Sequence, residues 1–223
     1  MRTWIPFFLP VCLLAASLIS WGQALPPLYR IDTVAGTLPG EEGVPVALAY
    51  LTRPTCALSD GKGGVLIVEQ EAHRIRRVAA DGRITLFAGT GAFGFSGDGG
   101  PATLAELNEP SFAVRDAAGN VYVSDTKNHR VRRIAPDGII TTVAGDGNAA
   151  HKGDGGPATA ASINLPQGVA VTATRLYIAE LGGLFLEDGF IRVVDLETGI
   201  ISPFAGGRRD PAEGIDADRK SVV

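Results

Sequence analysis

The sequence predicts an all-β fold, a β-propeller built of four-stranded antiparallel blades, and an internal repeat is the first reason. "HRIRRVAADG" at 73–82 returns as "HRVRRIAPDG" at 129–138, 56 positions later, and "IRVVDLETG" at 191–199 is a weaker third copy. The second reason is that each copy holds short runs rich in Val, Ile, Tyr and Thr, separated by Gly, Asn, Asp and Pro. A four-stranded unit repeated at roughly 50 residues is typical of propeller blades. A β-sandwich would lack this register between copies, so it is the weaker alternative.

Four recurring tetrapeptides mark where the units end. They are "TVAG" at 33–36, "LFAG" at 86–89, "TVAG" at 142–145 and "PFAG" at 203–206. This register places three blades at about 53–89, 109–145 and 165–206. The segment 29–36 has no blade before it, so we expect it to be an orphan outer strand that closes a ring of blades.

The second unit has the clearest strand boundaries. Its strands are expected at 112–115, 121–124, 129–135 and 139–144. The intervening "DAAGN", "DTKN" and "PDG" contain the residue types that form tight turns between antiparallel strands.

The first 24 residues have the composition of a secretory signal peptide. Arg2 provides a positive charge, residues 4–21 carry none, and small residues at 22 and 24 precede a cleavage point before Leu25. Two prolines in the apolar run weaken the alternative, an uncleaved membrane anchor. We therefore expect a secreted or periplasmic protein with no stable membrane span after cleavage.

Composition and charge narrow the classes of partner. The chain of 223 residues is 45% hydrophobic and 20% charged, as expected for one globular domain with a real core. Its net charge of −4 and pI near 5.4 give no electrostatic reason to expect a nucleic acid as partner.

The segment "GNVYVSDTKNHRVRRI" at 119–134 resembles the NHL repeat, which is named for an Asn-His-Leu run. Asn128 and His129 match the first two letters, and Arg130 stands where the Leu would be. In the first unit, His73 and Arg74 are the equivalent residues, without the Asn. The resemblance extends over nearly all of residues 29–206. It implies a six-bladed propeller of the kind found in many exported bacterial proteins, but no single activity.

Three blades against an implied six indicate a truncated propeller, so residues 25–217 are expected to be part of a larger one. The last six residues, 218–223, resemble a common sequencing adapter translated in one frame more than a continuing repeat. We interpret them as a non-native tail, and a natural polar end is the alternative.

The stretch "GDGGPAT" occurs at 97–103 and again at 153–159, each time ahead of a new blade. We expect it to be a joint in which Pro101 begins a short helical turn and the Asp98 carboxylate accepts hydrogen bonds from exposed amides. A phosphate loop would need a Lys followed by Ser or Thr, and neither follows the glycines. Calcium or another divalent cation is compatible with Asp98 or Asp154, but one carboxylate per loop is few. No cofactor is therefore predicted.

Arginines recur on the third strand of each unit. We expect them to pair with nearby Asp and Glu, and a ligand carrying carboxylates or phosphates is the alternative. They are Arg74, Arg76 and Arg77 in the first unit, Arg130, Arg132 and Arg133 in the second, and Arg192 in the third.

Signals for catalysis are few. The three histidines do not converge, and no Ser/His/Asp or HExxH pattern occurs, so we predict no catalytic residue. A metal-dependent propeller enzyme of lactonase or lyase type is the alternative function. It would use Glu69, Asp125 and Glu180, which end equivalent second strands and could face one another. The same positions equally suit the capping of turns.

Strand order predicts where a partner would bind. Loops after the second and fourth strands of antiparallel blades emerge on one side, which we call the loop face, and the other turns emerge on the turn face. We expect a binding or interaction scaffold whose loop face holds a protein or saccharide. The expected contact residues are Asp98, Asp125, Lys127, Asn128 and Asp154.

Overall fold

The computed structural model describes residues 42–181 and 189–206, and its strands form three four-stranded antiparallel sheets. Within each sheet the strands are neighbours in chain order. The first blade is β1 (Pro54–Ser59), β2 (Val65–Glu69), β3 (Arg74–Val78) and β4 (Ile84–Ala88). The second blade is β5 (Pro110–Arg115), β6 (Val121–Asp125), β7 (Arg130–Ile134) and β8 (Ile140–Ala144). The third blade is β9 (Pro166–Val171), β10 (Arg175–Glu180), β11 (Phe190–Asp195) and β12 (Ile201–Gly206).

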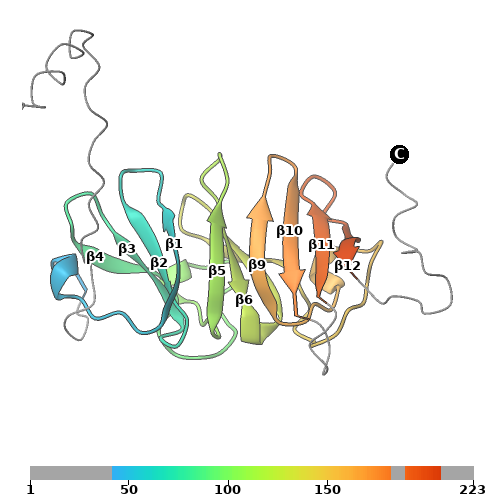
Figure 1. Cartoon of the computed structure of the whole chain (residues 1–223), viewed down its shortest axis with the longest axis horizontal. Helices are drawn as coiled ribbons and strands as arrows, with labels where there is room; N and C mark the ends of the chain where they lie inside the picture. The colour runs from blue at the N-terminus through green and yellow to red at the C-terminus, as the bar shows by residue number, and fades with distance from the viewer. Residues whose placement is uncertain (1–41, 182–188, 207–223) are drawn as a thin grey trace, which may run out of the picture. The chain divides into compact units, whose positions relative to one another are not determined.

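These sheets confirm the predicted fold class, and the strand boundaries of the second unit agree within two residues. The innermost strands β1, β5 and β9 pack beside one another, as the central part of Figure 1 shows. Each blade buries its strands against the next blade. Leu66, Val68 and Ile75 of the first blade pack with Val121 and Val123 of the second.

A second apolar cluster joins the second blade to the third. It contains Tyr122 and Val131 from one side and Leu176, Ile178 and Val194 from the other. Every residue of β6 is buried, because this strand has a blade on both sides. Neither face of β6 is therefore exposed to solvent.

The residue before each inner strand adopts a left-handed backbone conformation. Arg53, Glu109 and Leu165 have φ angles of 44°, 47° and 43°. This region is unfavourable for residues other than Gly, Asn or Asp. Its recurrence at the same position in three blades indicates that the repeat requires the bend there.

The linkers between blades follow a course that the sequence did not predict. The linker leaves the loop face at Gly97 and runs beside β8, so that Pro101 pairs with Ile139 near the turn face. The amide of Gly99 donates to the carbonyl of Ile140 at 2.8 Å, and the amide of Ile140 donates to the carbonyl of Gly100 at 3.0 Å. The linker therefore covers the free edge of an outer strand, whose hydrogen-bonding groups would otherwise be unpaired. This corrects the expectation that the whole linker lies on the loop face.

A third copy of this linker precedes the first blade and was not predicted from the sequence. Short 3₁₀ turns follow Pro45, Pro101 and Pro157, which lie 56 positions apart. These are η1 (Val46–Leu48), η2 (Ala102–Leu104) and η4 (Ala158–Ala160). Pro45 pairs with Arg83 as Pro101 pairs with Ile139. The shared pattern G-x-P-x-x-x-A, in register with the blade repeat, is the signal that would have found it.

Three predictions lie outside the described residues. They concern the signal peptide at 1–24, the orphan strand at 29–36 and the tail at 218–223. Among residues 42–181 and 189–206, no helix has the length and apolar composition needed to cross a membrane.

Candidate binding face

One arginine in the third strand of every blade is buried. Arg76, Arg132 and Arg192 are at most 2% exposed, and they occupy equivalent register positions. A buried guanidinium is tolerated only when its charge is paired and its donors are bonded. Each of these side chains therefore needs partners from the surrounding chain.

In the second blade, Arg132 binds two carboxylates and two carbonyls. Its Nη2 lies 2.8 Å from Oδ1 of Asp98, and its Nη1 lies 3.3 Å from Oδ2 of Asp125. The same guanidinium donates to the carbonyl oxygens of Ser96 at 3.1 Å and Glu106 at 3.5 Å. Arg132 thus ties both ends of the linker to the sheet.

The third blade repeats this arrangement. Nη2 of Arg192 lies 2.7 Å from Oδ1 of Asp154, and Nη1 lies 3.5 Å from Oε1 of Glu180. The guanidinium donates to the carbonyls of Lys152 at 3.1 Å and Ser162 at 2.9 Å. These atoms are the register equivalents of those around Arg132.

In the first blade, Nε of Arg76 lies 2.6 Å from Oε2 of Glu69, and Nη2 donates to the carbonyl of Tyr50 in the preceding linker. The prediction that the arginine rows pair with nearby acids is confirmed for at least one arginine in each blade, whereas Arg130 donates to the carbonyls of Asn128 and Asp146 instead. We call the set of Arg76, Arg132 and Arg192 with their carboxylates the arginine latches.

The latches correct the role expected of Asp98. The 3₁₀ turn after Pro101 begins as predicted, but no side chain caps it. Asp98 instead accepts from Arg132 and, through Oδ2, from the hydroxyl of Thr142 at 2.6 Å. A charged guanidinium is a stronger donor than an exposed amide, so the carboxylate turns toward it.

The acids at the ends of the second strands also cap backbone amides. Glu69 accepts from the amide of Thr52 at 2.8 Å, Asp125 from that of Asn108 at 2.7 Å, and Glu180 from that of Asn164 at 2.9 Å. Burial raises the pKa of Asp125 to about 6 and raises the pKa of Glu180. In the described part of the chain, no three His, Cys, Asp or Glu side chains come together as a metal site would require.

The NHL-type residues join one blade to the next. Nδ1 of His73 accepts from the amide of Glu109 at 3.1 Å, and Nδ1 of His129 accepts from the amide of Leu165 at the same distance. Both donors, Glu109 and Leu165, are the left-handed residues before the next inner strand. Burial, with the nearby charge of Lys127, lowers the pKa of His129. The ring therefore stays neutral, which leaves Nδ1 able to accept.

The other motif residues support this joint. Nδ2 of Asn128 donates to Oδ2 of Asp125 at 2.8 Å and to the carbonyl of Gly94 at 2.6 Å. Arg130 donates to the carbonyl of Asp146 at 2.7 Å, and Nε of Arg74 lies 3.0 Å from Glu69. These residues serve local structure first.

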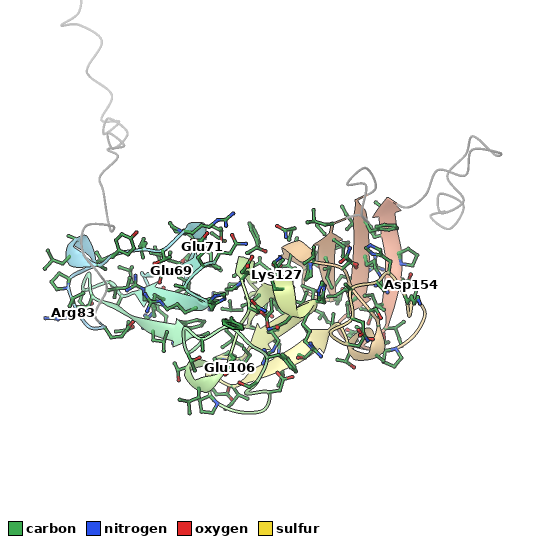
Figure 2. The ribbon with its side chains drawn as sticks, turned by 90° about the horizontal axis from the view of Figure 1, so that it is seen from below. Glu69, Glu71, Arg83, Glu106, Lys127 and Asp154 are labelled. Carbon is green, nitrogen blue, oxygen red and sulfur yellow. The ribbon has the colours of Figure 1, made fainter. Side chains whose placement is uncertain are left out.

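The predicted contact residues differ in how much of them reaches solvent. Asp125 is fully buried, so it does not reach a partner and acts as a support for Arg132, which corrects its expected role. The side chains of Asp98 and Asp154 are 38% and 42% exposed, and Lys127 is exposed. Figure 2 shows Lys127 between Glu69 of the first blade and Asp154 beside the third.

An exposed phenylalanine, which the sequence pattern did not single out, lies on the loop face against His73. Phe93 is 74% exposed and its ring centroid lies 6.0 Å from that of His73. Phe93 pairs with Leu107, and the amide of Lys127 donates to the carbonyl of the neighbouring Asn108. We call Phe93, His73, Lys127 and Asn128 the loop-face patch. The sequence contains a signal for Phe93, because the loop repeats in the next unit and the equivalent residue there is the small Ala149.

Residues 107–134, which include β5, β6 and the His129 joint, match the family model described as NHL repeat. The chain carries an NHL repeat. The matched segment holds Asn128 and His129 and ends within the strand that bears the buried Arg132.

Curated relatives with similar segments are much longer. Human teneurin-4 is 36% identical over 103 residues, which is 40% of this chain and 4% of that protein. NHL repeat-containing protein 2 from Gallus gallus is 32% identical over 98 residues, which is 44% of this chain and 12% of that protein. The chain thus spans a small part of the length of the curated relatives it matches.

Among solved structures, a putative gluconolactonase shares the fold at a TM-score of 0.50 and 12% identity, over 71% of this chain and 50% of that one. A Bacteroides thetaiotaomicron protein of unknown function aligns at a TM-score of 0.48 and 25% identity, over 52% of this chain and 30% of that one. The likeness to the putative gluconolactonase concerns the fold alone, an arrangement of propeller-like blades.

Proposed function

We propose that this chain is a binding module of an exported bacterial NHL-repeat protein, and that its partner is a protein held on the loop-face patch. The observation that carries the proposal is Phe93, an aromatic ring 74% exposed that lies against His73, on a loop face that also bears the exposed side chain of Lys127. Exposed aromatic side chains with a polar surround are typical of interface anchors. A saccharide is the other partner class that such a patch suits.

The joint beneath the patch supports the proposal. Asn128 and His73 are held by hydrogen bonds to Gly94 and Glu109 on neighbouring segments. Phe93 and Lys127 therefore project from a loop surface whose backbone is already fixed. Such preorganisation lowers the entropic cost of binding.

A direct test uses site-specific photo-cross-linking in the exporting cell. The photoreactive residue replaces Phe93 in one variant and Asp137, on the turn face, in a matched control. We expect one protein band cross-linked from position 93 and absent from position 137, and its loss when Lys127→Glu is added. Equal cross-linking at both positions, or binding on a glycan array that Phe93→Ser abolishes, would contradict a protein partner on this patch.

The alternative, a metal-dependent propeller enzyme, makes a different prediction. It requires a stoichiometric divalent cation in the purified full-length protein, which elemental analysis measures directly. In the described residues, Glu69, Asp125 and Glu180 are each bound to the arginine of their own blade. This observation favours the scaffold.

We also propose that further blades cover the third blade in the complete protein. Val131 of the second blade is fully buried, whereas its counterpart Ile191 is 38% exposed and Phe204 is 54% exposed. Both lie on the blade that has no described neighbour beyond it. Residues 25–223 alone are therefore expected to aggregate, and a monomer that unfolds cooperatively would count against the proposal.

A further inference from the structure

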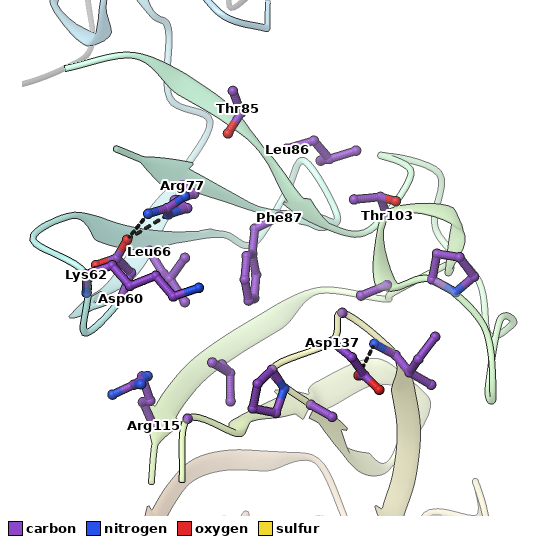
Figure 3. A pocket seen from close by; sticks show the side chains of 18 of the residues that line it. Asp60, Lys62, Leu66, Arg77, Thr85, Leu86, Phe87, Thr103, Arg115 and Asp137 are labelled. Carbon is purple, nitrogen blue, oxygen red and sulfur yellow. Dashed lines mark hydrogen bonds and ion pairs between the residues drawn. The ribbon is translucent and has the colours of Figure 1, made fainter. Parts of the chain in front are cut away.

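A groove of about 670 Å³ lies between the first and second blades on the turn face. Its walls come from the turns that follow β1, β5 and β7, together with the linker around Pro101. Figure 3 shows Lys62 and Arg115 on one side and Asp137 on the other, with Phe87 between the blades. The groove is separate from the loop-face patch, which lies at the opposite ends of the strands.

The charges of the groove do not balance. Both carboxylate oxygens of Asp60 already accept hydrogen bonds. Its Oδ1 accepts from the amides of Lys62 and Gly64 at 2.7 Å, and its Oδ2 accepts from Arg77 at 2.6 Å. Although burial opposes the effect, these bonds hold the pKa of Asp60 below its usual range. No described residue forms an ion pair with the side chain of Lys62 or Arg115. Three cations and two carboxylates therefore line the groove, and two of the cations have no ion-pair partner among residues 42–181 and 189–206.

The position of Arg115 is set by the chain. Its guanidinium extends from the end of β5 to the backbone of Gly61 in the first blade, where a Cβ atom would collide with it. Gly61 has a φ of +71°, which also disfavours other residues. The glycine thus allows Arg115 to lie beside the turn that carries Lys62.

The interior of the groove is apolar and unfilled. Leu66, Phe87 and Val121 line it. In the next blade, Tyr122 occupies the position of Leu66, since Leu66 pairs with Arg77 as Tyr122 pairs with Arg133. Tyr122 is 3% exposed and its hydroxyl donates to Asp116 at 3.3 Å. The smaller side chain at position 66 is accompanied by a larger one at position 87, where the second blade has Val143, and both Leu66 and Phe87 border the groove.

We propose that this groove binds a small organic anion. Its carboxylate, sulfonate or phosphate group binds Lys62 and Arg115, and its apolar body lies against Leu66 and Phe87. Arginine suits this role because its planar fork pairs with oxyanions through two parallel hydrogen bonds. A mostly apolar cavity with few placed charges is the usual form of a small-molecule site.

The test uses naphthalene-2-sulfonate as the probe and the complete protein, with affinity measured by calorimetry at two salt concentrations. We expect the double variant Lys62→Gln/Arg115→Gln to bind at least tenfold more weakly. The control Lys152→Gln removes one positive charge from an exposed lysine that lines neither the groove nor the loop-face patch, and it is expected to change affinity less than twofold. Binding to the unaltered chain is expected to weaken at higher salt.

A filled-groove variant separates the apolar part of the proposal from the charges. Leu66→Tyr copies the second blade and is expected to abolish probe binding while the far-ultraviolet circular dichroism spectrum is retained. Unchanged affinity in both the glutamine double variant and Leu66→Tyr would overturn the proposal. So would inorganic phosphate competing as well as the probe, because the apolar wall would then contribute nothing.

Discussion

The second and third blades hold the same buried arginine in different surroundings. Around Arg132 and Arg192, the linker carbonyls and the half-exposed aspartate are equivalent. Beside each of these arginines lies a stacked pair of an aromatic ring and a basic side chain, and the two members are exchanged between the blades. Phe95 lies over Arg130 at 3.7 Å in one blade, whereas His151 stacks on Phe190 at 4.2 Å in the other. The aromatic ring and the basic group have traded positions.

This difference separates what the repeat requires from what it tolerates. The guanidinium is buried and its charge must be compensated, so the latch is kept. The stacked pair is partly exposed, and either order of ring and base covers the latch. The exchange also gives Glu180 a partner that Asp125 lacks, because Nδ1 of His151 lies 2.8 Å from Oε2 of Glu180.

The largest effect is expected from removing the latch in the second blade. Arg132→Met leaves the fully buried Asp125 without its cation, which costs about 3 to 5 kcal/mol in the free energy of unfolding. Arg192→Met is expected to cost at least about 1 kcal/mol less, because His151 still contacts Glu180. Urea unfolding of both variants measures the difference. A larger loss for Arg192→Met would show that the histidine does not compensate the carboxylate.

The pH dependence of stability is expected to follow the strand-end acids. Burial raises the pKa of Asp125 from 3.8 to about 6, so the folded state holds this proton more tightly than the unfolded state. Its contribution to stability is therefore present below about pH 4 and is lost as pH rises through 6, by up to about 3 kcal/mol. Asp125→Asn removes this loss. Relative to the variant, the wild-type chain should become less stable between pH 4 and pH 7 in denaturant titrations.

The same pH-dependent measurement can be made in the third blade on Glu180, the equivalent of Asp125. Burial also raises the pKa of Glu180, so Glu180→Gln is expected to give a difference of the same sign. A wild-type chain that gains stability relative to either variant as pH rises would contradict the assigned direction.

The sequence predicted the blades because their signals are local and repeated. Hydrophobic alternation, turn residues and a 56-residue register fix strands wherever they recur. The pairing of arginines with acids also followed, since buried or clustered charges need compensation. The identity of each partner did not follow: Arg132 reaches Asp98, 34 positions away, through a linker whose course depends on the free edge of β8.

Other features needed the assembled blades. Asp125 looked available on a loop, but packing on both sides of β6 buries it. Phe93 and the groove at Leu66 are departures from the repeat. A single chain shows such departures only after the copies are aligned residue by residue, and burial decides which of them face solvent.

A smaller effect is expected at the joints between blades. His129→Asn keeps a residue type that tolerates the left-handed conformation, but it removes the Nδ1 acceptor for the amide of Leu165. The expected cost is about 1 to 2 kcal/mol, the penalty for an unpaired amide that is partly buried. His73→Asn should cost a similar amount. Lys127→Ala is the control, with a change within about 0.5 kcal/mol because the side chain is exposed.

The smallest effect concerns the exchanged pair itself. Phe95 lies over the guanidinium of Arg130, so Phe95→His is expected to cost about 0.5 to 1 kcal/mol through loss of the cation–π contact. Arg130→Phe is expected to cost more, because it also removes the hydrogen bond to the carbonyl of Asp146. The double variant Phe95→His/Arg130→Phe rebuilds the order found in the third blade. Its stability should recover, with a coupling energy of about 0.5 to 1 kcal/mol in a double-mutant cycle. Strictly additive losses would mean that the order of the pair depends on Glu180, whose longer side chain is replaced by Asp125 in the second blade.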